Sequence, residues 1–235
     1  MDIQVIASGS SGNCYRVSDG QTALLLECGL NIQKIKQGTN FRLSETAACL
    51  LTHGHKDHSK AVKDIMKSGI DVYCSQGTAE ELNISGHRLH TIKPMQWHRI
   101  GTFEVMAFDV VHDTKEPFGF VVRNKTDKLL YLTDTAYSKY SFKGLTRVMV
   151  ECNYIGDILK QNTETGRLDM TLKNRLLKTH FSLENVKKFL KACDLSKVRE
   201  VYLLHLSKDN SDVARIKKEI QGLTGKLVKI GGYDD

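Results

Sequence analysis

Four potential metal ligands fall within six residues of one another, directly after a short apolar run. Residues 47–51 read AACLL and residues 52–58 read THGHKDH, which places His53, His55, Asp57 and His58 on one short segment. Three imidazoles and a carboxylate crowded on one loop repel one another or compete for protons unless a positive charge holds them together. A bound divalent cation is therefore the simplest interpretation, against a polar loop whose histidines cluster by chance.

The spacing of these four side chains favours two ions over one. A single catalytic zinc usually combines three protein ligands with one water, whereas this cluster alone offers four groups. His53 and His55 can converge on one ion as the chain leaves a strand. Asp57 and His58 lie past a turn and can reach a second ion.

The composition indicates a folded globule of one domain, residues 1–235. The chain has 40% apolar residues and only two prolines, and its length suits a single α/β unit. Residues 1–8 lack a basic start and a long apolar core, so we expect no signal peptide, no membrane partner and a cytoplasmic protein. The cysteines show no Cys-x-x-Cys pair, which predicts reduced, buried thiols. They are Cys14, Cys28, Cys49, Cys74, Cys152 and Cys193.

The net charge of +7 and the pI near 9.0 suit an anionic substrate such as a nucleotide or a nucleic acid. Charge alone leaves a second interpretation open, in which the excess forms a solvated helix face. Much of it lies on Lys173, Arg175, Lys178, Lys187, Lys188, Lys191, Lys197 and Arg199.

Alternation of apolar runs with turns predicts a strand-rich first half and a more helical second half. The expected strands are 3–7, 14–17, 23–26, 48–51, 72–74, 103–111, 119–122, 129–132, 148–151, 201–204 and 226–230. The expected helices are 58–67, 183–192 and 213–223. Ser182 is the predicted cap of the second helix, and Asn210 or Ser211 that of the third.

Three further ligand candidates stand where an apolar strand meets a loop. His112 follows FDVV, Asp134 follows LYLT and His205 follows VYLL. If two metals sit at the first loop, ligands from other strand ends must complete them, and these three positions fit.

The order His-x-His-x-Asp-His, then His, Asp and His at strand ends, resembles the metallo-β-lactamase superfamily over nearly the whole chain. The resemblance implies an α/β (α+β) fold, a four-layer αββα sandwich in a single domain with metals at its rim. It implies that one ion is held by His53, His55 and His112, the other by Asp57, His58 and His205, with Asp134 bridging. Such mixed ligands admit Zn²⁺, the expected ion, as well as Mn²⁺ or Fe²⁺.

Further motifs narrow the resemblance to one branch of phosphodiesterases. His180-Phe181-Ser182 matches the His-x-Ser/Thr element of ribonuclease Z-like enzymes. The segments 8–13 (SGSSGN), 112–113 (HD), 116–120 (EPFGF), 133–135 (TDT) and 151–153 (ECN) are similar to the YycJ/WalJ type, which includes DNA exonucleases. Phage anti-Pycsar enzymes, which destroy cyclic nucleotides, are related. Two departures stand out: Glu27 replaces an Asp before Cys28-Gly29, and Tyr154 replaces a His after Asn153.

The resemblance assigns roles to the candidate site. Two ions about 3.5 to 4 Å apart would lower the pKa of a bridging water and polarise the phosphoryl oxygens. Asp57 would also orient that water or accept its proton, and His180 would stabilise the transition state or protonate the leaving group, unless it is a structural histidine beside a helix start. The candidates for substrate contact are Ser10, Ser11, Asn13, Asn153 and Ser182. The first three could merely shape a turn.

Several functions remain open from the sequence. The first is a phosphodiesterase for DNA or RNA ends or for cyclic nucleotides, expected as a homodimer, in a bacterial host cytoplasm if phage-encoded. The others are a thioester or lactam hydrolase on the same metal core and a non-catalytic relative. A flavodiiron-like redox module would carry Glu in place of His55. We interpret His87, His90 and His98 as loop residues because they match no motif.

Overall fold

The computed structural model describes residues 1–232, in which the chain divides into two compact units. The first comprises Met1–Asp109 with Thr114–Thr126, and the second Val110–Asp113 with the chain from Asp127 onward. Each unit combines strands with covering helices, so the predicted α/β class with two sheets is confirmed. The assignment of 1–235 to a single domain stays a prediction.

The first unit begins with a six-stranded sheet in which β1, β2 and β3 pair antiparallel and β3 to β6 pair parallel. An antiparallel ladder of β7, β8 and β9 follows. The strands are β1 (Asp2–Ala7), β2 (Cys14–Ser18), β3 (Ala23–Leu26), β4 (Thr46–Leu50), β5 (Asp71–Cys74), β6 (Leu89–Thr91), β7 (Trp97–Ile100), β8 (Phe103–Asp109) and β9 (Phe118–Arg123). The helices are α1 (Ile32–Gly38), the short 3-10 turn η1 (Leu43–Glu45), α2 (Lys56–Ser59), α3 (Val62–Lys67) and α4 (Gln76–Glu81).

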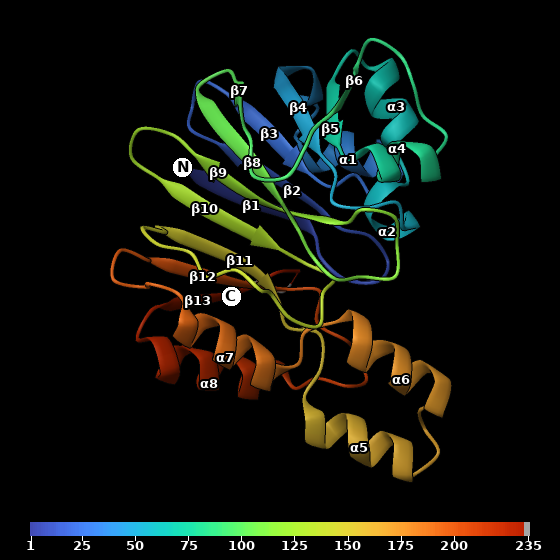
Figure 1. Ribbon diagram of the computed structural model, residues 1–235, viewed down its shortest axis with the longest axis vertical. Helices are drawn as coiled ribbons and strands as arrows, with labels where there is room; N and C mark the ends of the chain where they lie inside the picture. Colours follow the sequence, from blue (N-terminus) through green and yellow to red (C-terminus); the bar gives the residue numbers. More distant parts are fainter. Residues whose placement is uncertain (233–235) are drawn as a thin grey trace. The chain divides into compact units, whose positions relative to one another are not determined.

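Helices α1 and α3 bury their apolar sides against the six-stranded sheet (Figure 1). Ile35 of α1 and Ile65 of α3 are fully buried and belong to one cluster with Cys49 of β4 and Val72 of β5. Among the parallel strands, β3 is a continuous buried apolar run, whereas β5 alternates buried and half-buried residues. This core fixes the end of β4, from which the ligand segment departs.

Replacing Ile65 by alanine is expected to destabilise the protein by about 2 to 5 kcal/mol, because a fully buried side chain leaves a cavity. Urea denaturation followed by circular dichroism measures the change. Lys63→Ala, on the exposed side of the same helix, should shift the midpoint little. Equal midpoints for the two variants would contradict the packing described.

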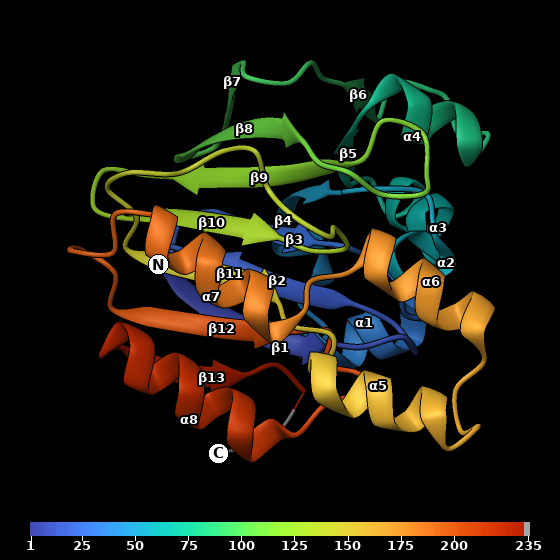
Figure 2. The same cartoon turned by 60° about the horizontal axis from the view of Figure 1, so that its bottom comes forward.

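The second unit is built on four parallel strands whose carboxyl ends meet at one edge. They are β10 (Lys128–Leu132), β11 (Arg147–Glu151), β12 (Glu200–Leu204) and β13 (Leu227–Ile230), and its helices are α5 (Gly156–Glu164), α6 (Met170–Thr179), α7 (Leu183–Ala192) and α8 (Val213–Thr224). Figures 1 and 2 show α7 and α8 running along this sheet, with α5 and α6 beyond the strand ends. Such an edge of a parallel sheet is a usual place for a site.

The ligand segment itself folds differently from the prediction. Two short helices, α2 and α3, replace the single helix expected over 58–67. The backbone N–H of Ala61 bonds Cys28 O at 2.9 Å, which draws the chain out of helical geometry between them. Asp57 and His58 lie on the first turn of α2, which begins at Lys56, two residues before the predicted helix start. The structure also ends strand 103–111 at Asp109, the last residue of β8 paired with β9.

The predictions for helix caps, loop histidines and cysteines are in part confirmed and in part wrong. Ser182 caps α7 as predicted, whereas Asp212 caps α8 in place of Asn210 or Ser211. His90 and His98 lie in β6 and β7, so their assignment to loops is wrong. All six cysteines are buried and free, which confirms the prediction of reduced thiols. In the described part of the chain, every helix is too short or too polar to span a membrane.

Candidate metal centre

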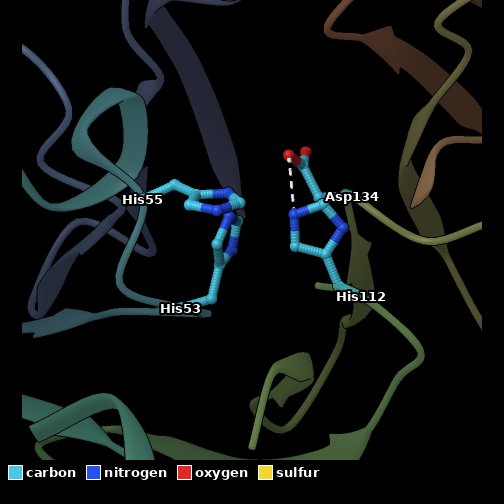
Figure 3. A group of neighbouring side chains, drawn as sticks. All are labelled: His53, His55, His112 and Asp134. Carbon is cyan, nitrogen blue, oxygen red and sulfur yellow. Dashed lines mark ion pairs between the residues drawn. The ribbon is translucent and has the colours of Figure 1, made fainter. Parts of the chain in front are cut away.

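In the first unit, His53 follows β4 by three residues and its ring orientation is fixed. Thr52 Oγ1 lies 2.8 Å from His53 Nδ1, and both residues are buried. With Nδ1 engaged, the ring presents Nε2 on its other side, as a metal-binding histidine does. The rings of His53 and His55 meet edge to face with centroids 4.9 Å apart (Figure 3). His58 approaches the same group, its centroid 4.2 Å from that of His53.

A buried carboxylate stands behind this group. Glu27 is fully buried; its Oε1 lies 3.6 Å from His58 Nδ1, and its Oε2 accepts from Thr52 N at 3.4 Å. Its backbone is left-handed, with φ of 65°, a strained geometry for a residue other than glycine. Glu27 is longer by one methylene than the aspartate expected at this position, yet its carboxylate still contacts His58 and Thr52 of the ligand segment.

Asn13 ties the β1–β2 loop to the ligand segment. Its side-chain nitrogen lies 3.4 Å from Asp57 Oδ2 and 3.2 Å from His58 Nε2, and its backbone N–H donates to Asp57 O at 2.7 Å. Its Oδ1 accepts from Gly9 N and Tyr15 OH. A Cβ at Gly29 would lie 1.7 Å from Asp57 O, so only glycine fits there. Of the three predicted substrate contacts on this loop, Asn13 is fully buried, whereas Ser10 and Ser11 are exposed.

In the second unit, three strand ends bring two carboxylates and an imidazole together. His205 Nδ1 lies 2.9 Å from Asp134 Oδ1 and 3.3 Å from Glu151 Oε1. Asp134 and His205 both have positive φ, 46° and 53°, so each leaves its strand through a sharp turn. Burial works against the imidazolium, yet Asp134 and Glu151 raise the pKa of His205 to about 10. The negative potential that holds this proton also suits a cation.

His112 joins this edge from the segment after β8. Its Nδ1 lies 3.1 Å from Thr179 O, at the end of α6, and its Nε2 lies 3.7 Å from Asp134 Oδ2 (Figure 3). Asp113 Oδ1 is 3.3 Å from the same Nε2, and Asp113 also accepts from Arg175 Nε at 2.8 Å. Burial lowers the pKa of His112, which favours the neutral imidazole that binds metals.

His180 is paired with Glu151, a residue that the sequence reasoning did not select. His180 Nδ1 lies 2.6 Å from Glu151 Oε1, and Phe181 N donates to Glu151 Oε2 at 3.1 Å. Burial opposes charge on His180, but the Glu151 carboxylate raises its pKa above the usual value. One ligand-type atom from each of Asp134, Glu151, His180 and His205 falls within 4.8 Å of the others. Glu151 ends an apolar strand, so the rule that selected His112, Asp134 and His205 would have found it.

The other two predicted substrate contacts lie beside this group and are buried. Asn153 Nδ2 donates to His205 O at 2.9 Å, and Ser182 Oγ accepts from Asn185 N as the cap of α7. Tyr154, the departure from the exonuclease motif, is buried, and burial raises its pKa to about 12. These bonds give Asn153 and Ser182 structural roles, and their contact with substrate stays a prediction.

Each unit therefore gathers groups whose chemistry fits a divalent cation. The first offers imidazole nitrogens and the Asp57 carboxylate, and the second offers imidazoles facing two buried carboxylates. Nitrogen and oxygen ligands of this kind bind zinc or manganese. All seven predicted ligands lie in these two groups, while their coordination of an ion stays a prediction.

Comparison with known proteins agrees with this arrangement. Exodeoxyribonuclease YycJ of Bacillus anthracis is 27% identical over 226 residues, 90% of this chain and 84% of the relative. Two solved structures share the fold: the metallo-β-lactamase fold protein YhfI from Bacillus subtilis (16% identical, TM-score 0.72, 98% of this chain and 97% of that one) and zinc-bound PqqB from Methylobacterium extorquens (13%, 0.72, 99% and 99%).

These similarities confirm the resemblance to the metallo-β-lactamase superfamily and its YycJ/WalJ branch, and the prediction of a metal-dependent hydrolase. The β-lactamase superfamily domain matches residues 22–206, a span that includes all seven predicted ligands. On that match the chain belongs to the β-lactamase superfamily.

Proposed function

We propose that this protein is a metal-dependent phosphodiesterase that hydrolyses nucleic-acid ends. The observation that carries the proposal is the Glu151–His180 pair, which places a proton-holding imidazole among the ligand-type atoms of Asp134 and His205. Similarity to YycJ along most of both chains supports a DNA substrate, and so does the net charge of +7.

The proposed ligands divide between two ions as the superfamily resemblance implies. His53, His55 and His112 would hold one, Asp57, His58 and His205 the other, and Asp134 both. When bound, such ions supply a nucleophile at neutral pH and neutralise charge on the phosphoryl oxygens. Thr52 orients the ring of His53, and Glu27 orients the ring of His58, each through the Nδ1 atom of that histidine.

The protein's own groups then perform the proton transfers. Asp57, held by Asn13, would accept a proton from the attacking water. His180 would donate its proton from Nε2 to the leaving alkoxide, because Glu151 engages Nδ1 and favours the imidazolium. Afterwards Glu151 keeps the neutral ring in the same orientation.

Other substrates are alternatives to nucleic-acid ends. Cyclic nucleotides are the second candidate substrate, since they require the same bond cleavage. A thioester hydrolase would have no need of a paired general acid such as His180, because a thiolate leaves without a proton, and a lactam hydrolase stays an alternative that turnover decides. We also propose that the protein is cytoplasmic, because its six buried cysteines are free, and that it is a homodimer.

Side-by-side turnover tests the function. The purified protein, supplied with Zn²⁺ or Mn²⁺, is incubated with labelled DNA, RNA, cyclic mononucleotides, a thioester and a β-lactam. Cleavage of DNA from its ends is the expected result. Hydrolysis of the thioester or the lactam with all phosphodiesters intact would refute the proposal.

A further inference from the structure

The loop after Asp134 carries an exposed aromatic ring on a firmly held backbone. Among the described residues of the second unit, the exposed large apolar side chains are Val111, Tyr137, Met170, Leu172, Leu177 and Leu227. Tyr137, 53% exposed, is the aromatic member of that group. A single exposed ring is common on protein surfaces. What distinguishes Tyr137 is the hydrogen bonding that ties its backbone to the residues beside the predicted ligands.

Hydrogen bonds connect this ring's backbone to the ligand residues. Thr135, which is fully buried and directly follows Asp134, donates from Oγ1 to Tyr137 O at 2.8 Å. The same Oγ1 accepts from Val111 N at 3.3 Å. Val111 directly precedes His112 and is 46% exposed. One buried hydroxyl therefore holds both exposed apolar residues beside two predicted metal ligands.

The rest of the loop is also fixed. Asn185 of α7 donates from Nδ2 to Ala136 O at 3.1 Å. Ser138 Oγ bonds both the backbone N–H and the carbonyl of Tyr140. A ring presented on such a backbone loses little conformational freedom when a ligand stacks on it. The fold thus holds the backbone of an exposed aromatic residue three positions after Asp134, a predicted metal ligand.

We infer that Tyr137 stacks on a nucleobase of the substrate, with Val111 alongside, and thereby selects nucleotides over other phosphodiesters. The inference rests on the proposed function and adds the class of group recognised next to the reacting phosphate. Every base has an aromatic face, so stacking accepts any sequence. Lys139, whose Nζ lies 5.2 Å from the centre of the Tyr140 ring, adds positive charge to the same loop.

Steady-state kinetics with matched substrates test the inference. One oligonucleotide ends in a normal nucleotide and the other in an abasic residue, and a cyclic mononucleotide forms a third arm. Tyr137→Ala should raise KM for the base-bearing oligonucleotide by about 5-fold to 150-fold, the cost of one lost stack, and leave kcat unchanged. KM for the abasic end should not change. Tyr137→Phe should behave as wild type, because the ring and not the hydroxyl makes the stack.

The controls separate this inference from the proposed function. Phe41→Ala removes an aromatic side chain that is 74% exposed in the other unit, and it should leave KM unchanged. An effect in the cyclic arm alone would assign the base to a cyclic nucleotide. Equal KM changes on base-bearing and abasic ends, or none on either, would overturn the inference. If wild type cleaves no arm, the proposed function fails, and anisotropy with phosphorothioate versions of the two oligonucleotides still decides whether Tyr137 binds a base.

Discussion

Replacing Asp134 by asparagine is expected to reduce turnover to below about one-thousandth of wild type, since metal stabilisation of the transition state is worth several kcal/mol. Asp134 lies against both His112 and His205, so the loss of its charge weakens cation binding on either side of it. Asparagine tolerates the left-handed backbone of this position, with φ of 46°, and keeps the shape of the side chain. Atomic absorption of the purified variant measures bound metal, and a nuclease assay measures turnover.

A matched variant shows whether this effect belongs to the site. Asp209 is an exposed aspartate four residues beyond His205. Asp209→Asn should keep full metal content and activity. Chelation of wild type should reproduce the Asp134→Asn defect, and added Zn²⁺ or Mn²⁺ should restore the wild type alone. Full metal content and activity in Asp134→Asn would remove it from the centre.

Replacing His180 by alanine is expected to lower kcat on DNA by about 10² to 10⁴, the usual contribution of a general acid. The same change should cost much less on bis-p-nitrophenyl phosphate, because p-nitrophenolate leaves without a proton. Metal content should stay at the wild-type level, since His180 is not among the proposed ligands. An equal loss on both substrates would assign His180 to charge stabilisation, and loss of metal would make it a ligand.

The Glu151→Gln variant tests the Glu151–His180 pair through the pH dependence of kcat. Glu151 raises the pKa of His180, so the proton-donating form persists to higher pH than in an isolated histidine. Removing the carboxylate charge should lower that pKa, and the alkaline limb of the kcat profile should move to lower pH. An unchanged limb would separate Glu151 from the proton donor.

The sequence singled out the candidate ligands because each follows a local rule. His53, His55, Asp57 and His58 are close in the chain, and His112, Asp134 and His205 each follow an apolar run that ends at a loop. Parallel strands then carry such ends to one edge, as β10, β11 and β12 do in the second unit. The missed helices α1, α4, α5 and α6 lack a long apolar face, and α6 buries only Thr179.

The supporting residues depended on contacts that no local pattern encodes. Glu27 reaches Thr52 across 25 positions, Asn13 reaches Asp57 across 44, and His180 reaches Glu151 across 29. Each of these groups satisfies its hydrogen bonds only when strands distant in sequence are paired. The split of 58–67 into α2 and α3 has the same origin, because Ala61 bonds Cys28.

By itself, then, the sequence determined the α/β class, the superfamily and the identity of the metal-binding candidates, since strand-end position and residue type are properties of short segments. Only the tertiary structure decided which carboxylate orients His180, which side chains hold His53 and His58, and that Thr135 presents Tyr137 beside the site. Those choices depend on distances between residues far apart in the chain, and folding alone sets such distances.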